Sequence, residues 1–161
     1  MAVRDCQELG SNLFKIALRL LNNQRLCKYL KYTDANPLDN PDFKNPVKEI
    51  LHHNIKVVPL VNVDENTTEG TICVVYDSGE VNSNAEFDDI FLSVLIYTPL
   101  REWQINDMNL RPFLIMSEIE KSIKNKTIDG LGKLKYNGFK LKLVTDDISC
   151  YQMLFSLDTF D

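Results

Sequence analysis

One apolar run constrains the fold more than any other segment of this chain. It lies between Glu86 and Pro99, and its centre contains Ile90, Phe91, Leu92, Val94, Leu95 and Ile96. A short run rich in β-branched and aromatic side chains, and ended by a proline, is typical of a strand covered on both faces. The sequence therefore predicts a strand from Glu86 to Thr98 that belongs to a well-packed sheet.

Three further segments have the pattern of strands. Apolar residues occupy every second position from Tyr151 to Leu157, which predicts a strand at 149–158 with one buried face. A strand is also expected at 71–76, ending in a turn at Asp77-Ser78-Gly79. Residues 55–63 are β-branched but contain a proline, which indicates an edge strand or a bent strand.

Two segments have helical periodicity. In residues 5–31, apolar side chains recur at steps of three and four, and Asn22-Asn23 is expected to break or bend this helix. A second helix is predicted from Leu110 to Lys124, where Pro112 lies near the start. Its apolar positions are best explained by packing against the sheet.

A polar, proline-containing loop is predicted at 33–46. It contains three prolines, and Asn45-Pro46 at its end resembles a helix cap followed by proline, so a short helix to His52 is expected. Residues 1–161 are accordingly predicted to form a single α+β domain. In this domain an antiparallel or mixed sheet packs against the N-terminal helix and the second helix.

The dipeptide Asn137-Gly138 predicts a β-hairpin. It separates two segments in which lysines alternate with apolar residues, and Asn-Gly is the preferred centre of a tight hairpin turn. Such a turn pairs Lys135 with Lys140 and Lys133 with Lys142, so one face of the hairpin is basic. Either water or an anionic partner is expected on that face.

Charge is strongly segregated along the chain, although the net charge is only −5. Residues 57–100 contain eight acids and no lysine or arginine, whereas residues 121–142 contain seven lysines and one acid. These blocks are either solvated faces or complementary surfaces that meet between copies of the chain. The second interpretation assigns a subunit interface to Lys133, Lys135, Lys140, Lys142, Glu80, Glu86, Asp88 and Asp89.

No residue is assigned to catalysis, to a cofactor or to a metal, and the chain is not expected to be an enzyme. Neighbouring residues on a helix diverge by about 100°, so His52-His53 does not converge on one ion. Asp88-Asp89 and Asp146-Asp147 are explained by a strand start and a turn. The four cysteines are expected to be buried or half-buried reduced thiols.

The last third of the chain resembles the tail-terminator and tail-completion proteins of the neck of tailed bacteriophages. The similarity in amino-acid sequence lies in Leu110–Ile119, Asp129–Gly132 and Asp146–Tyr151, and the order of helices and strands is similar over most of the chain. This resemblance implies a non-enzymatic ring subunit in the virion, between the capsid and the tail. The implied partners are further copies in a hexamer or dodecamer, the adjacent portal, adaptor and tail proteins, and DNA that passes through the lumen without sequence-specific binding.

Two other interpretations stay open. One is a regulatory or adaptor module that uses the same sheet and loop surfaces, and the other is a small enzyme or ligand-binding domain. No apolar run approaches the length of a membrane span and no secretion signal is visible, so synthesis in the host cytoplasm and no membrane contact are expected. The polar segments 33–46 and 64–70 are the expected contacts to adjacent rings.

Overall fold

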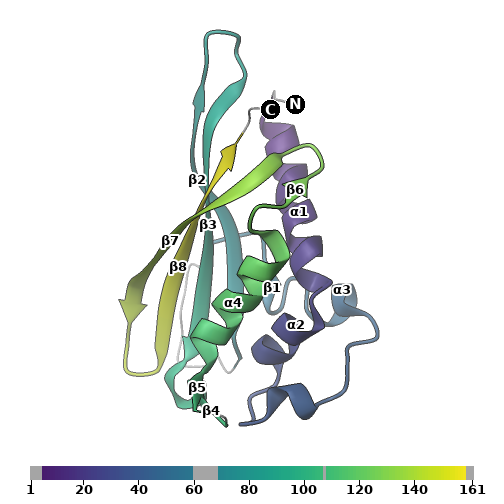
Figure 1. Cartoon of the computed structure of the whole chain (residues 1–161), viewed down its shortest axis with the longest axis vertical. Coiled ribbons are helices and arrows are strands. Elements are labelled where there is room, and N and C mark those ends of the chain that lie inside the picture. The colour runs from purple at the N-terminus through teal and green to yellow at the C-terminus, as the bar shows by residue number, and fades with distance from the viewer. Residues whose placement is uncertain (1–4, 60–68, 107, 159–161) are drawn as a thin grey trace.

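The computed structural model describes residues 5–59, 69–106 and 108–158. Within them, helices cover one face of a six-stranded mixed sheet, which confirms the predicted α+β class (Figure 1). The helices are α1 (Cys6–Leu21), α2 (Gln24–Lys31), η1 (Pro37–Asp39), α3 (Pro46–Glu49), η2 (Leu100–Glu102) and α4 (Arg111–Ile123). The strands are β1 (Ile55–Lys56), β2 (Thr71–Val81), β3 (Phe87–Pro99), β4 (Gln104–Ile105), β5 (Asn109–Leu110), β6 (Thr127–Ile128), β7 (Gly132–Val144) and β8 (Ile148–Asp158).

The strand order of the main sheet is β1-β2-β3-β8-β7-β6. Only β1 and β2 are parallel, and the other neighbours are antiparallel. The apolar run that constrained the fold is β3, which lies between β2 and β8 as a central strand should. The short strands β4 and β5 form a separate pair that the sequence did not predict.

Asparagines set the helix boundaries. The side chain of Asn23 accepts a hydrogen bond from the backbone N–H of Leu26, so α2 starts anew where the sequence predicted a break. Asn45 caps α3 in the same way, with Pro46 in the first turn as expected. That helix is shorter than predicted, because it ends at Glu49 and His52 adopts a positive φ of 66°.

The main core lies between the helices and the face of the sheet that carries Ile72, Val94 and Phe155. A smaller buried cluster of Cys73, Tyr97, Ile148 and Cys150 lies on the opposite face. Of the four free cysteines, Cys6 is exposed and so departs from the prediction, whereas the other three are buried. None of the helices in the described part of the chain is long and apolar enough to cross a membrane.

The prediction of a β-hairpin at Asn137-Gly138 is wrong. Residues 132–144 form one continuous strand, β7, and the predicted turn is only a bulge in its pairing with β8 between Tyr136 and Gly138. A type I′ turn needs positive φ at both central residues, but of these two only Gly138 has one, at 115°. The long partner strand β8 therefore overrides the local turn signal, and no lysine pairs with another lysine.

The prediction of a turn at Asp77-Ser78-Gly79 is also wrong. Strand β2 passes through it with register shifts and continues to Val81. The chain reverses at Asn82–Glu86 instead, where the Asn82 side chain accepts hydrogen bonds from the backbone of Asn84 and Glu86. Of the strand predicted at 55–63, only Ile55–Lys56 is a strand, and residues 60–63 lie outside the described residues.

A buried arginine connects α4 to α2, and no pattern in the sequence predicted it. The side chain of Arg111 is fully buried and donates hydrogen bonds to the backbone carbonyls of Tyr29, Tyr32, Asp34 and Glu102 at 2.7–2.8 Å. The first two carbonyls belong to the C-terminal end of α2, where helix carbonyls have no partner within the helix. Arg111 thus completes that helix end.

Candidate functional site

One wide hollow of the described surface is a basic groove between α1–α2 and α4. Its volume is about 810 Å³, and it is open to solvent along one side. Five of its lining residues are cationic, and they come from α1, α2, α4 and the segment before β6: Lys15, Arg19, Arg25, Lys121 and Lys126. We call this hollow the cationic groove.

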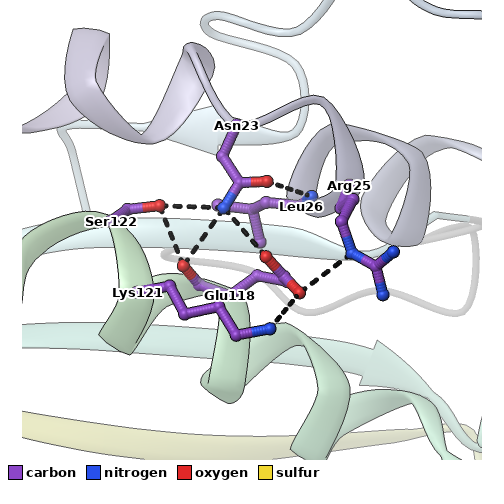
Figure 2. A network of polar contacts seen from close by, with 6 residues as sticks. All are labelled: Asn23, Arg25, Leu26, Glu118, Lys121 and Ser122. Carbon is purple, nitrogen blue, oxygen red and sulfur yellow. Dashed lines mark hydrogen bonds and ion pairs between the residues drawn. The ribbon is translucent and has the colours of Figure 1, made fainter.

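One carboxylate beneath the cationic groove is already fully engaged. Glu118 is 5% exposed and accepts hydrogen bonds from Asn23 at 3.0 Å, Arg25 at 3.2 Å and Lys121 at 2.9 Å (Figure 2). Burial alone would raise the pKa of this carboxyl, but the donors from Asn23, Lys121 and Arg25 outweigh burial and hold the pKa below its usual value. Glu118 therefore stays ionised and ties α2 to α4.

The remaining cations of the groove are not neutralised in this way. Lys15 donates to the backbone carbonyl of Asp129 rather than to a carboxylate. Neither Arg19 nor Lys126 forms an ion pair with any of the residues that the structure describes. Lys15 and Arg19 are four residues apart, so they project from the same face of α1. The groove consequently keeps a surplus of positive charge.

A second surface follows the outer edge of β7. Strand β6 pairs only with Gly132 and Lys133, so no described strand covers β7 from Lys135 to Val144 on that side. We call this segment the β7 edge. Its apolar side chains are unusually exposed, with Phe139 and Leu141 both at 52%. Phe139 also contacts Phe113 and Tyr151, which extends the apolar surface onto α4 and β8.

A third surface is the hairpin formed by the ends of β2 and β3, which projects beyond the rest of the sheet (Figure 1). We call residues 77–89 the acidic hairpin. Glu80 and Asp89 are exposed, whereas Glu86 and Asp88 are half-buried and already have interaction partners in the chain. Strand β1 pairs with β2 only at Ile72 and Cys73, so among the described strands the outer edge of this hairpin is uncovered.

The structure brings the predicted lysines onto one strand and the predicted acids onto one hairpin, but it keeps the two groups apart. All four lysines (Lys133, Lys135, Lys140 and Lys142) are exposed on β7. The acids Glu80, Glu86, Asp88 and Asp89 lie on the acidic hairpin or beside its turn. Strand β8 lies between β3 and β7, so the two groups are on different strands of the sheet.

The acidic and histidine pairs that the sequence analysis explained without catalysis lie far apart in the sequence and on different segments. His52 and His53 lie in a turn after α3, where His52 contacts the ring of Phe14. Asp146 and Asp147 occupy the turn between β7 and β8, as predicted. The part of the chain that the structure describes holds no group of three or more His, Cys, Asp and Glu residues arranged to bind a metal ion.

Sequence reasoning missed the cationic groove. Its residues come from two segments about 100 positions apart, which only the packing of α1 and α2 against α4 brings together. A partial signal was present, because residues 1–35 and 121–142 are the two basic blocks of the sequence. Two basic blocks in one chain are candidates for a shared surface.

The model of a protein family, YomW, matches residues 23–157, which is most of the chain. No curated protein matches the chain.

Proposed function

Because the chain belongs to the YomW family, a phage-derived protein family, we propose that it is a structural subunit of the phage particle. In this proposal the protein has no catalytic role. Copies of the chain form a ring in the head–tail neck or at the top of the tail, and DNA passes through the ring. Six or twelve copies are the numbers that the resemblance to neck proteins implies.

The observation that carries the proposal is that the sheet has two unlike edges that no described strand covers. The β7 edge combines exposed apolar side chains with lysines, and the acidic hairpin combines an uncovered strand with carboxylates. Two such surfaces on one molecule are complementary to each other rather than to themselves. Complementary, unlike surfaces produce head-to-tail contacts, which close into a ring when the rotation between copies divides the circle.

The chemistry of the contact follows from these two surfaces. Backbone N–H and C=O groups on the uncovered side of β7 are available to pair with a strand of the next copy. Lys133, Lys135 and Lys140 would then meet Glu80 and Asp89 of that copy. Opposite charges at such an interface mainly fix register and partner choice, and they make assembly sensitive to salt.

The loop at 33–46 supports a second part of the proposal, which is contact with adjacent rings. The loop is held against the body, because the Gln24 side chain both donates to and accepts from the backbone of Phe43. Within the loop, Asp39 and Asp42 are exposed, and Asp42 also pairs with Lys28. Of the other expected contact segment, residues 64–68 lie outside the described residues.

A charge-swap experiment tests the head-to-tail contact. Changing Lys133, Lys135, Lys140 and Lys142 to glutamate is expected to abolish rings while the circular dichroism spectrum stays that of the folded protein. A second variant adds Glu80→Lys and Asp89→Lys to these four changes, and it is expected to restore assembly because the signs are complementary again. Unchanged assembly of the first variant would remove the lysines from the interface.

The exposed apolar side chains of the β7 edge also favour a second candidate, an adaptor that takes an extended segment of another protein as an added strand. This candidate predicts a protein that stays monomeric or dimeric at all concentrations. The mass of the wild-type protein in solution therefore separates the two candidates.

A further inference from the structure

The cationic groove has a composition that neither helix packing nor the proposed ring contact explains. Three of its cations have a structural use, because Arg25 and Lys121 hold Glu118 and Lys15 holds the Asp129 carbonyl. Arg19 and Lys126 have no such use among the described contacts. Five cations around one buried carboxylate leave a local surplus of four positive charges on a chain whose net charge is −5.

The shape of the groove narrows the choice of ligand. It is a wide, shallow hollow rather than an enclosed pocket, whereas sites for small molecules bury most of the ligand surface among apolar side chains. Its lining is dominated by long, cationic side chains from several elements. Arginine and lysine together are the usual donors to phosphate oxygens, and spaced cations along an open groove match a chain of phosphates.

Uncharged polar side chains also line the groove, and the amide groups of Asn23 and Gln24 already donate to Glu118 and to the Phe43 carbonyl. Asn22, Asn23 and Gln24 line the groove at the junction of α1 and α2. The N-terminal end of α2 also lies here, and the partial positive charge of a helix N-terminus favours an anion. No lining residue belongs to a β-strand, and no aromatic residue lines the groove, so it has no platform on which bases would stack.

We propose that the cationic groove binds the phosphodiester backbone of nucleic acid without reading its sequence. The binding is electrostatic, and it depends on Arg19 and Lys126 as the two cations that are not engaged elsewhere. This inference does not depend on the ring, because a single copy of the chain contains the whole groove.

The expected salt dependence of DNA binding follows from the release of counterions. For double-stranded DNA the logarithm of the binding constant falls with the logarithm of the salt concentration with a slope of about −0.9 per phosphate contacted. Four contacts predict a loss of roughly 100-fold in affinity between 50 and 200 mM salt. Removing two of the four should reduce that loss to roughly 10-fold.

The test is fluorescence anisotropy of a labelled 20-base-pair DNA duplex titrated with the full-length protein at both salt concentrations. The variant Arg19→Ala/Lys126→Ala removes two cations that make no ion pair in the described structure. The matched control, Lys48→Ala/Lys56→Ala, removes the same charge from α3 and β1, outside both the groove and the proposed ring contact. We expect the groove variant to bind more weakly and to have the smaller salt dependence, and the control to bind as the wild-type protein does.

Three results would overturn the inference. The first is no binding of the wild-type protein at 50 mM salt, and the second is an equal loss in the two variants, which would show that net charge alone decides. The third is a groove variant that binds DNA normally but loses self-association. That result would assign the groove to an acidic surface of another copy.

Discussion

Replacing Arg111 with methionine is expected to destabilise the fold severely, although Arg111 is buried and is not itself a residue of any proposed contact surface. Its guanidinium is fully buried and has four carbonyl partners, at Tyr29, Tyr32, Asp34 and Glu102. Burial lowers the pKa of Arg111, and the nearby carboxylates of Glu102 and Asp34 oppose that shift. Methionine fills much of the same space but donates no hydrogen bond.

The magnitude can be worked from the lost donors. A hydrogen bond from a charged group contributes about 1.5–3 kcal/mol, and a buried carbonyl left without a donor costs about 1–3 kcal/mol. These contributions are not additive, and removing a buried charge recovers part of its desolvation cost. The free energy of unfolding is therefore expected to fall by about 3–5 kcal/mol. For a domain of this size each kcal/mol corresponds to roughly 2–4 °C, so the melting temperature should fall by about 6–20 °C.

Thermal and urea unfolding followed by circular dichroism measure this loss. The matched control is Arg19→Met, because Arg19 is half-buried on α1 and makes no ion pair that the structure describes. That substitution should change the free energy of unfolding by no more than about 0.5 kcal/mol, as is usual for surface substitutions. A stability of Arg111→Met within 1 kcal/mol of the wild-type protein would refute the role assigned to Arg111.

Three further predictions concern the pH dependence of stability and the course of β7. Burial raises the pKa of Glu102 to about 7 from 4.5, so its ionisation should lower stability by up to about 3 kcal/mol as pH rises through this range, and Glu102→Gln should remove that loss in urea titrations at pH 5 and 8. The pKa of Glu118 is held low, so its contribution is present above pH 4.5 and disappears on acidification; Glu118→Gln should destabilise at pH 7 by about 2 kcal/mol and much less at pH 3, and an equal effect at both pH values would contradict the ion pairs. Gly138→Ala should cost about 1–2 kcal/mol because its φ is 115°, whereas Asn137→Ala should change unfolding by less than about 0.5 kcal/mol; a large cost at Asn137 would favour the tight hairpin turn over the bulge.

The parts of the fold that the sequence predicted are those in which a local pattern and the tertiary contacts agree. The central strand β3 was predicted to within one residue at each end, and α4 was predicted equally well. In both segments most of the apolar positions behind the prediction pack in a buried cluster, whereas Phe91 and Phe113 are 43% and 41% exposed. The break at Asn22-Asn23 was also correct, because capping is a property of neighbouring residues alone.

The errors occurred where a long-range partner overrode a local signal. Asn137-Gly138 is a strong turn signal in isolation, but β8 pairs with residues on both sides of it and absorbs the extra residue in a bulge. Asp77-Ser78-Gly79 was misread for the same reason, since β3 continues opposite it to Phe87. A pattern within one segment contains no information about the length of its partner strand.

The candidate surfaces also were predictable only where a pattern lies within one segment of the sequence. The lysines of β7 and the acids of the acidic hairpin were visible as charge blocks, and their assignment to an interface between copies stays a prediction. Arg111 was not found, because a single arginine beside a proline has no distinguishing pattern until its four carbonyl partners are known. The cationic groove was not found, because it depends on how the helices pack.

The mass of the protein in solution tests the central claim most directly. Light scattering behind size exclusion, over a range of protein and salt concentrations, measures it without reference to any partner. A ring of charged, head-to-tail contacts predicts one discrete mass of six or twelve chains, which dissociates as salt is raised. A monomer or dimer at every concentration would contradict the ring and favour the adaptor.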